Sequence, residues 1–568
     1  MDKIWLASYP PGVRHEISVD RPASLKALLE HSCARFADRP AFTHMGTQLS
    51  YGELDRLSRH FGAFLQNELG LAKGDRIAVM MPNCLQQPVA VLGALRAGLA
   101  VVNVNPMYTA GELAHQLNNA GAAAIVVLEN FAATLEKARA EVAPLRHVVV
   151  TQLGDLLPAP QGWVVNTVVK RVKHMVPEWS LPGAWHLRDA LALGGRRTLH
   201  EVEIGSSDLA FLQYTGGTTG RPKGAMLSHG NLVANVEQTI AWLGGSLEDG
   251  EETIVTALPL YHVFALTANL LTFLRLGANN VLITDPRDLK HLVATLKSTR
   301  FSAITGVNTL FDALLDAPGI EAVAQHNQGA LKVAVAGGMA LQRSVAERWQ
   351  KLFGRLLLQG YGLSEASPIV CGDRIDATEF TGKLGLPLPS TEVAILDETG
   401  QPVPLDTPGE ICVRGPQVMT GYWNAPAETD NVFTSDGWLR TGDIGRMDAA
   451  GYVEFVDRRK DIIVVSGFKA FPAEIEDAVR EHPLVKDAGV VGVPDGRTGE
   501  SVALFVVPRD PSLTVEMLRE HCAGRLTAYK RPKTIELRAD LPRTSLGKVL
   551  RRQLKDEAMQ AAQAHAAA

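Results

Sequence analysis

Cysteine is scarce in this chain, and the few cysteines stand far apart. The 568 residues include five cysteines and no Cys-x-x-Cys pair. A zinc site or a redox motif needs closely spaced cysteines, and a disulfide framework needs several of them in a short chain. The sequence therefore gives no signal for a cysteine-based metal site or a disulfide framework, and it suits a reducing compartment.

Long apolar runs are missing as well. A membrane-spanning helix needs roughly 18 or more uncharged apolar residues, and Arg96 interrupts the longest candidate, at residues 90–105. Residues 1–20 contain no apolar segment of the kind that a secretory signal requires. We therefore expect a cytoplasmic protein. Peripheral attachment to the inner face of the cytoplasmic membrane is compatible with these absences.

Neither sign of charge dominates the composition. The net charge is −5 at pH 7, which argues against a protein that binds nucleic acid through phosphate contacts, so we expect no nucleic-acid partner. Hydrophobic residues make up 46% of the chain and charged residues 21%, as in ordinary soluble globular proteins. The length exceeds that of a typical single domain, so more than one domain is expected.

Apolar runs alternate with helical patterns over most of the chain. Residues 76–81 have the pattern of a buried strand, residues 86–98 that of a helix, and residues 100–105 and 122–128 that of further strands. This order is typical of a largely parallel sheet covered by helices. The same rhythm continues through the apolar runs at residues 251–260, 279–285, 301–307 and 331–338.

The pattern changes after about Gly385. Residues 392–415 contain short alternating strands with turn signals, which predict a small antiparallel subdomain. A new series of strand, turn and helix begins near residue 457, with a helix start at Pro472. The expected fold class is α/β. A large N-terminal domain, residues 1–457, has parallel-rich sheets with helices plus the antiparallel β subdomain, and a small α+β C-terminal domain follows at residues 458–568.

One glycine-rich loop stands out. The segment "YTGGTTGRPKGA", residues 214–225, contains four glycines, three threonines and a lysine. Backbone N–H groups and threonine hydroxyls in such a loop can converge on a polyphosphate, and Lys223 adds a positive charge. The segment is not a Walker A motif, because Pro222 precedes Lys223 and Gly224 follows it. Taken alone, the loop is also compatible with a flexible turn that binds nothing.

Four further segments accompany this loop and together carry a family resemblance. In chain order the five are "YTGGTTGRPKGAMLSHGN" from Tyr214, "YGLSEASP" from Tyr361, "DGWLRTGDIG" from Asp436, "VDRRKDIIVVSGFKAFPAEIE" from Val456, and "LPRTSLGKVLRR" from Leu541. The chain resembles the adenylate-forming (ANL) superfamily over nearly its whole length. It is most similar to bacterial long-chain fatty acid–CoA ligases of the FadD type.

The resemblance implies an acid–thiol ligase that uses ATP and CoA as co-substrates and Mg²⁺ as cofactor. Such an enzyme converts a fatty acid and ATP to acyl-AMP and pyrophosphate, and then transfers the acyl group to the CoA thiol. Because both reactants of the first step are anions, cationic groups must neutralise charge in its transition state. By the resemblance, Thr215 and Glu365 lie near Mg²⁺, and Tyr361 stacks on adenine. Asp443 accepts hydrogen bonds from both ribose hydroxyls, and Arg458 is a second contact to the ribose or phosphate. The implied ATP-binding residues are Tyr214, Thr215, Gly216, Gly217, Thr218, Thr219, Gly220, Lys223, Gly224, Tyr361, Gly362, Asp443, Arg458 and Lys548.

Lys548 matches the C-terminal catalytic lysine of the family, which bridges the carboxylate and the α-phosphate. The loop and Lys548 lie far apart in the sequence, so the resemblance implies a mobile C-terminal domain that closes for the first step and then rotates. Lys460 occupies the hinge position of the family. Ser466, Gly467 and Lys469 fall on the loop that faces CoA after the rotation.

The acyl site is less clearly marked. His262 resembles a catalytic-site residue at the junction of the acyl chain and the pantetheine, although a lone histidine beside apolar residues is often part of the core. Some long-chain members have a tryptophan gate where this chain has Leu266, so the gating of a tunnel stays open. The acyl-binding residues that the resemblance implies are Val263, Phe264, Leu266, Gly337 and Gly338.

Residues 163–179 allow two interpretations. Five valines, at positions 165, 168, 169, 172 and 176, recur at helical spacing, and Lys170, Arg171, Lys173 and His174 fall largely elsewhere around the helix. An amphipathic helix of this kind suits a contact with a membrane surface. It equally suits a helix that packs on the large domain.

The expected partners are therefore a long-chain fatty acid, ATP and CoA, with a membrane-surface contact and a homodimer as further expectations. Two rival functions stay open. The first is an adenylate-forming ligase for medium-chain or aryl acids, or for a carrier-protein acceptor. The second is a fatty-acid-binding uptake protein without turnover, which would need none of Lys548, Glu365 and Asp443.

Overall fold

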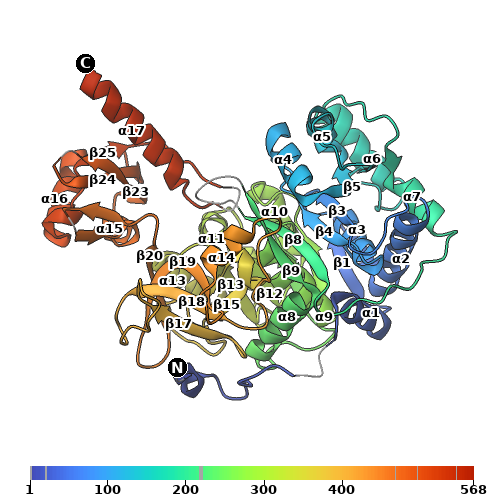
Figure 1. Ribbon diagram of the computed structural model, residues 1–568, viewed down its shortest axis with the longest axis horizontal. Helices are drawn as coiled ribbons and strands as arrows, with labels where there is room; N and C mark the ends of the chain where they lie inside the picture. The colour runs from blue at the N-terminus through green and yellow to red at the C-terminus, as the bar shows by residue number, and fades with distance from the viewer. Residues whose placement is uncertain are drawn as a thin grey trace. The chain divides into compact units, whose positions relative to one another are not determined.

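The computed structural model describes residues 3–18, 22–215, 222–466, 468–495, 497–544 and 547–567. These residues form two compact units (Figure 1). The larger unit comprises Leu6–Glu392 and Arg414–Phe433, and the smaller comprises Met1–Trp5, Val393–Val413 and Thr434–Ala568. The domain boundary at residue 457 stays a prediction, because the smaller unit contains residues from both sides of it.

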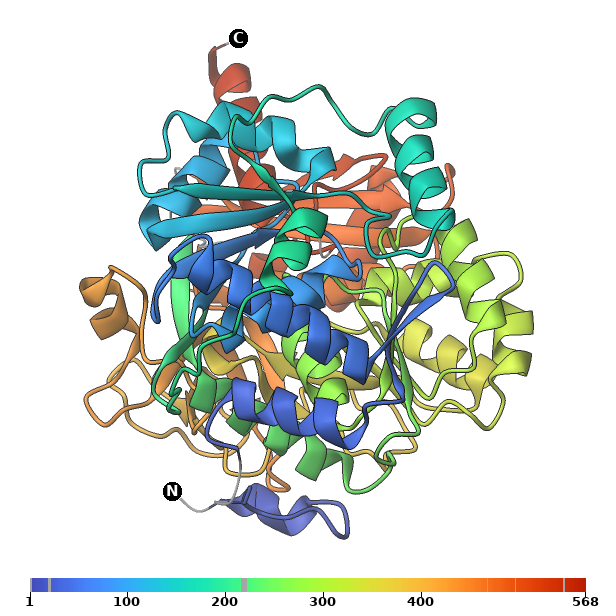
Figure 2. The same cartoon turned by 90° about the vertical axis from the view of Figure 1, so that its right-hand side faces the viewer.

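The larger unit contains a seven-stranded sheet with the order β7-β6-β5-β3-β4-β8-β9. Every pair is parallel except β8–β9, which is antiparallel. Figure 2 shows helices of this unit, coloured blue to teal, alongside these strands. The strands are β3 (Arg76–Met80), β4 (Ala100–Asn103), β5 (Ala122–Leu128), β6 (His147–Thr151), β7 (Trp185–His186), β8 (Leu209–Thr215) and β9 (Lys223–Ser228).

A nine-stranded sheet with the order β16-β15-β14-β13-β12-β10-β11-β1-β2 completes the larger unit. Its central pairs are parallel, and the pairs at its two edges are antiparallel. The strands are β1 (Pro40–His44), β2 (Thr47–Ser50), β10 (Thr253–Thr256), β11 (Asn279–Leu282), β12 (Ala303–Gly306), β13 (Val333–Gly337), β14 (Leu358–Gly362), β15 (Ile369–Gly372) and β16 (Leu386–Pro387).

Burial explains why the apolar runs form central strands. All seven residues of β5 are buried, as expected for a parallel strand that is covered on both faces. The strands predicted at residues 76–81, 100–105 and 122–128 and the helix predicted at residues 86–98 are confirmed. The main helices of this unit are α1 (Leu25–Arg35), α2 (Tyr51–Asn67), α3 (Gln86–Arg96), α4 (Ala110–Ala120), α5 (Ala132–Arg139), α7 (Leu187–Gly194), α8 (His229–Leu243), α10 (Leu289–Ser298), α11 (Asn308–Leu315), α12 (Ile320–His326), α13 (Arg343–Phe353) and α14 (Pro426–Val432).

The smaller unit contains two sheets that are mostly antiparallel. One has the order β17-β18-β19-β20, and the other has the order β22-β21-β24-β23 with β25 beside β24. The antiparallel subdomain predicted after Gly385 is the first of these. The elements are β17 (Glu392–Leu396), β18 (Gly409–Arg414), β19 (Leu439–Met447), β20 (Val453–Arg458), β21 (Ile463–Val465), β22 (Phe468–Ala470), β23 (Val485–Asp495), β24 (Gly499–Pro508), β25 (Thr534–Leu537), α15 (Pro472–Arg480), α16 (Val515–Arg525) and α17 (Arg551–Ala567).

The amphipathic segment forms a short helix. It begins as α6 (Gln161–Thr167) and continues as the π-helix η3 (Val168–Val172). The helix therefore ends before Val176, which the sequence pattern had placed on the same helical face. His174 follows with a positive φ of 50°, which is incompatible with a continuing helix.

All five cysteines are free and buried. Burial raises the pKa of each thiol, to about 11 for Cys33 and about 12 for Cys84 and Cys412, and above the ordinary value for Cys371 and Cys522. Within the part of the chain that the structure describes, no helix has the length and the apolar character needed to cross a membrane.

Candidate active site

The glycine-rich loop is framed by the last two strands of the seven-stranded sheet. Thr215, the last residue of β8, precedes the loop, and Lys223, the first residue of β9, follows it. These two residues pair directly in the antiparallel ladder. Tyr214 pairs with Gly224, where an added Cβ would lie 3.1 Å from the Tyr214 ring, so glycine relieves a tight contact at this position. The loop residues Gly216, Gly217, Thr218, Thr219 and Gly220 lie outside the described residues.

The end of the same motif starts a helix. Ser228 precedes α8, its hydroxyl accepts a hydrogen bond from the Asn231 N–H, and the Asn231 side chain accepts one from the Ser228 N–H. This reciprocal cap fixes where α8 begins. The segment "SHGN" at the end of the motif therefore has a structural role. This role is separate from the phosphate binding that the resemblance implies for the loop.

Lys223 meets two residues that the sequence did not single out. Its ammonium pairs with the Glu428 carboxylate on α14 and lies 5.3 Å from the centroid of the Tyr422 ring. The Lys223 side chain is 25% exposed, so its charge is held at the surface and accessible to an anion. A lone tyrosine and a lone glutamate in "GYWNAPAE" give no signal in the sequence, which explains why both were missed.

Tyr361, Gly362 and Glu365 follow one another around a tight turn. Tyr361 and Gly362 end β14, and Glu365 lies in the 3-10 helix η5 (Ser364–Ala366). A Cβ at Gly362 would lie 2.1 Å from the Pro368 carbonyl oxygen, so only glycine fits at this position. The turn places the Glu365 carboxylate against Tyr422, whose hydroxyl donates a 2.7 Å hydrogen bond to it.

The surroundings of Glu365 fit a magnesium ion. Among the described residues, no three His, Cys, Asp or Glu side chains gather into a metal cage. Mg²⁺ typically takes one or two protein carboxylates and completes its shell with waters and substrate phosphates. A single half-buried carboxylate that is oriented by Tyr422, on a turn that contacts β8 and β9, matches this requirement.

Replacing Tyr422 by phenylalanine is expected to raise the Mg²⁺ concentration for half-maximal activity about 10- to 100-fold, which is the usual cost of losing a group that orients a metal ligand. The ring and its contact with Lys223 stay in place, so only the hydrogen bond to Glu365 is lost. Titration of Mg²⁺ at saturating ATP measures the effect. Tyr9→Phe is the matched control, because it removes a buried 2.7 Å hydrogen bond to Pro387. Equal Mg²⁺ dependence in the two variants would contradict the assignment.

The residues expected to bind the acyl chain belong to two neighbouring segments. Val263 and Leu266 are fully enclosed, whereas Phe264 is half-buried. A Cβ at Gly337 would lie 2.9 Å from the Phe264 ring, so this glycine lets the ring approach β13. His262 is half-buried, and its Nδ1 accepts a 3.3 Å hydrogen bond from the Phe264 N–H. Gly338 has a φ of +78°, a conformation that favours glycine.

In the smaller unit, Asp443 and Arg458 face each other on adjacent strands. They pair in the antiparallel ladder of β19 and β20, and the Arg458 Nε lies 3.5 Å from the Asp443 Oδ1. The Asp443 side chain is 12% exposed. The sequence placed these two residues in separate motifs, and the structure brings them together.

Lys548 belongs to the same cluster. Burial, followed by the Arg458 and Lys460 charges, lowers its pKa to about 8, and Asp443 acts in the opposite direction. The 3.4 Å ion pair between Arg551, three residues after Lys548, and Asp457, one residue before Arg458, joins the two segments. The lysine is therefore within electrostatic reach of the Asp443–Arg458 pair. Its backbone is held by Thr544, whose hydroxyl accepts a 3.2 Å hydrogen bond from the Lys548 N–H.

The hinge and CoA candidates lie on exposed parts of the smaller unit. Lys460 is exposed and follows β20 by two residues. Ser466 is in the turn between β21 and β22 with a φ of +51°, and the exposed Lys469 pairs with Glu398 at 3.1 Å. Gly467 lies outside the described residues.

The predicted ATP- and metal-binding residues thus fall into two clusters, one in each unit. Thr215, Lys223 and Glu365 mark the first, and Asp443, Arg458 and Lys548 mark the second. Tyr361 and Gly362 adjoin the first cluster through the η5 turn. The polar groups that support both clusters were not found from the sequence.

Comparison with known proteins identifies the family. Residues 29–423 match the family model described as AMP-binding enzyme, and residues 474–548 match the AMP-binding enzyme C-terminal domain. A curated relative, the long-chain-fatty-acid–CoA ligase of Escherichia coli O6:H1, is 52% identical over 558 residues, which cover 98% of this chain and 99% of the relative.

Solved structures agree with this result. ATP-bound MatB from Rhodopseudomonas palustris is 27% identical with a TM-score of 0.80, over 94% of this chain and 99% of MatB. The anthranilate CoA ligase AuaEII in complex with anthranoyl-AMP shares the fold, with a TM-score of 0.82 at 22% identity over 96% of this chain and 99% of that chain. The predicted α/β fold class is confirmed. The chain belongs to the AMP-binding enzyme family, and its curated relatives in that family include long-chain-fatty-acid–CoA ligases.

Proposed function

We propose that this protein is an AMP-forming long-chain fatty acid–CoA ligase. In the first step, an oxygen of the fatty acid carboxylate attacks the α-phosphorus of ATP, the bond to the β-phosphate breaks, and acyl-AMP and pyrophosphate form. In the second step, the sulfur of CoA attacks the acyl carbon, the bond to the AMP oxygen breaks, and the thiol proton is released. Acyl-CoA and AMP are the products.

The observation that carries the proposal is the cluster of Lys548 with the Asp443–Arg458 pair. It occurs in a chain that is 52% identical, over almost its full length, to a ligase named for long-chain acids. A cation beside a carboxylate suits a nucleotide, since the carboxylate can accept the ribose hydroxyls while the lysine meets the reacting anions. A protein that only binds fatty acids has no use for this combination.

The roles of the other ATP-binding residues are assigned from the same two clusters. The β- and γ-phosphates are held by Thr215, Lys223 and the loop between them. When bound, these phosphates replace Glu428 as the partner of the Lys223 ammonium. Tyr361 stacks on adenine beside Gly362. Thr215 and Glu365 hold Mg²⁺, which supplies positive charge to the phosphates when it is bound. Lys548 contacts the carboxylate and the α-phosphate.

The acyl and CoA roles are assigned in the same way. His262 lies at the junction of acyl chain and pantetheine, and Val263, Phe264, Leu266, Gly337 and Gly338 line the acyl site. Their largely apolar character suits a fatty acid, which needs few polar contacts. Ser466, Gly467 and Lys469 receive CoA, after residues 458–568 turn about Lys460.

Pyrophosphate release tests the proposal directly. It is measured with ATP and Mg²⁺ for straight-chain acids from acetate to oleate, with and without CoA. Fast release with long acids that continues only when CoA is present supports a long-chain CoA ligase. Release that peaks with short or aryl acids would establish a different acid, and release that ignores CoA would indicate another acceptor such as a carrier protein. No release with any acid would indicate a binding protein.

We also propose that the α6–η3 segment contacts an anionic membrane surface. Trp163, Val172 and Met175 are exposed to 71%, 67% and 53%, and the exposed Arg171 and Lys173 lie between them in the sequence. An amphipathic surface helix with Trp and basic residues is typical of interfacial binding. The expected homodimer stays a prediction, which light scattering in solution would test.

Charge reversal of Arg171 and Lys173 is expected to weaken binding to phosphatidylserine vesicles by about 30-fold or more, because each basic residue near such a surface contributes about 1 kcal/mol. Lys170 is left unchanged, since it pairs with Glu129 at 2.6 Å and its loss would disturb the fold. Co-sedimentation with vesicles measures the binding. Lys290→Glu with Arg300→Glu gives the same charge change elsewhere on the surface. Equal losses in both double variants would leave no specific role for the segment.

A further inference from the structure

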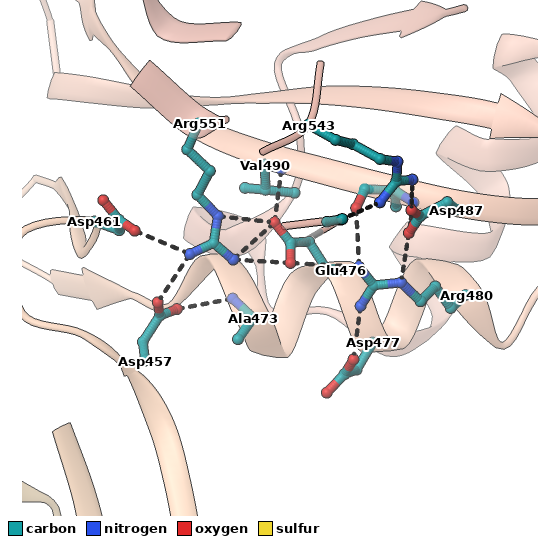
Figure 3. A network of polar contacts seen from close by, with 12 residues as sticks. Asp457, Asp461, Ala473, Glu476, Asp477, Arg480, Asp487, Val490, Arg543 and Arg551 are labelled. Atoms are coloured by element: carbon teal, nitrogen blue, oxygen red, sulfur yellow. Dashed lines mark hydrogen bonds and ion pairs between the residues drawn. The ribbon is translucent and has the colours of Figure 1, made fainter. Parts of the chain in front are cut away.

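A network of buried charges surrounds the start of α17. Arg551 is the first residue of this helix and forms a fork with Glu476, with Nη2 2.8 Å from Oε2 and Nε 3.1 Å from Oε1. Its Nη1 lies 3.1 Å from the Asp461 carboxylate and 3.4 Å from the Asp457 carboxylate. Figure 3 shows the guanidinium at the centre of these three carboxylates. All three guanidinium nitrogens of Arg551 therefore have a carboxylate partner.

Asp457 is the unusual member of this network. Its side chain is fully buried, and it lies on β20 directly before Arg458. The second carboxylate oxygen accepts a 2.8 Å hydrogen bond from the Ala473 N–H, in the first turn of α15. Both oxygens thus connect β20 to residues that come after Lys460 in the chain.

A second arginine holds the other end of the segment that carries Lys548. The Arg543 Nη1 donates a 2.9 Å hydrogen bond to the Gly547 carbonyl, and its Nη2 pairs with Asp487 (Figure 3). Asp487 also pairs with Arg480 at 3.1 Å. These contacts join residues that all follow Lys460. Of the two arginines, Arg551 is the one with a contact to β20.

We propose that Arg551 is a positioning residue for Lys548, and that its pair with Asp457 is a latch that holds the arrangement needed for acyl-adenylate formation. The inference rests on the proposed function. A rotation at Lys460 keeps Glu476 and Asp461 with Arg551, because all three follow the hinge. The same rotation separates Arg551 from Asp457. The latch therefore closes in one arrangement and opens in the other.

The location of the latch explains its effect on the lysine. Arg551 lies three residues after Lys548, Asp457 lies one residue before Arg458, and the two are 3.4 Å apart. Closing the pair brings the lysine segment to the strand end that carries Arg458. A buried carboxylate that loses its cationic partner is strongly unfavourable. Intermediate positions, in which Asp457 stays buried without Arg551, are therefore disfavoured, and the closed arrangement is a single well-defined position.

Separate assays of the two half-reactions test this inference. Arg551→Gln is expected to slow acid-dependent ATP–pyrophosphate exchange by about 10- to 100-fold, the loss that follows from misplacing a catalytic group by about 1 Å. Thioester formation from supplied acyl-AMP and CoA is expected to proceed at the wild-type rate, because that step does not use the latch. Arg551→Lys keeps the charge without the fork and should recover part of the exchange rate. Asp457→Asn should resemble Arg551→Gln.

Lys555→Gln provides the control, since it removes a cation from the same helix that pairs only with Glu500, at 3.4 Å, among the described contacts. Parallel loss of both half-reactions in Arg551→Gln would indicate a purely structural role and overturn the proposal. So would an unchanged exchange rate. If Arg551→Gln does not fold, Asp457→Asn and Arg551→Lys decide by the same criterion. Wild-type protein without any exchange activity would instead overturn the proposed function.

Discussion

Replacing Lys548 by alanine is expected to slow acyl-adenylate formation by about 100- to 1,000-fold, the usual cost of removing one group that stabilises transition-state charge. ATP and the fatty acid should still bind, because the other residues proposed to bind them, Asp443 and Tyr361 among them, are unchanged. Acid-dependent ATP–pyrophosphate exchange measures the rate, and calorimetry measures ATP binding. An exchange rate equal to that of the wild type would contradict the role given to this lysine.

The same lysine sets a pH dependence. Burial, followed by the Arg458 and Lys460 charges, lowers the pKa of Lys548 to about 8, with Asp443 opposing the shift. The cationic form is complete well below this pH and disappears as the pH rises through it. The kcat/KM for ATP in the exchange reaction should therefore fall above about pH 8. In Lys548→Arg the guanidinium stays charged throughout, so any activity it retains should lack this decline.

Replacing Asp443 by asparagine is expected to raise the KM for ATP by about 10- to 100-fold, because each hydrogen bond to a charged group contributes about 1.5–3 kcal/mol. The amide keeps the size of the side chain but loses the charge that pairs with Arg458. Asp443 also raises the pKa of Lys548. Its loss should therefore move the decline in kcat/KM to lower pH, a change that a simple folding defect would not produce.

Glu454→Gln is the matched control for Asp443→Asn. Glu454 pairs with Arg446 at 2.9 Å across the same two strands, β19 and β20. The substitution Glu454→Gln removes an ion pair of the same type and leaves Lys548, Asp443 and Arg458 unchanged. A similar increase in the KM for ATP in both variants would mean that the strand pair, and not the Asp443 carboxylate, determines ATP binding.

The strands were easier to predict than the site. Residues 122–128 are apolar without interruption, and β5 covers the same seven residues, because a strand that is covered on both faces leaves no position for polar groups. The helix beyond residue 163 was harder. The valine spacing continued to Val176, but the turn at His174 ended the helix at Val172. A short periodic pattern contains little information on where a helix stops.

The site was predictable where the chain carries ordered motifs and not where it depends on contacts between distant residues. Lys548 and Asp443 stand in recognisable segments. The hydrogen bond from Tyr422 to Glu365 joins positions 57 residues apart, and the contact between Arg551 and Asp457 joins positions 94 residues apart. The motifs mark Glu365, and they contain Asp457 and Arg551, but no local pattern records which distant residue each of these contacts.

The five buried cysteines have a consequence for chemical selectivity. A mixed anhydride of a fatty acid and AMP is an acylating agent that reacts with any accessible thiolate. In this protein every thiol is enclosed, and the raised pKa of each keeps it protonated near neutral pH. The sulfur that the activated acid meets is then the one that arrives with CoA. The scarcity and burial of cysteine thus leave no thiolate of this chain open to the activated acid.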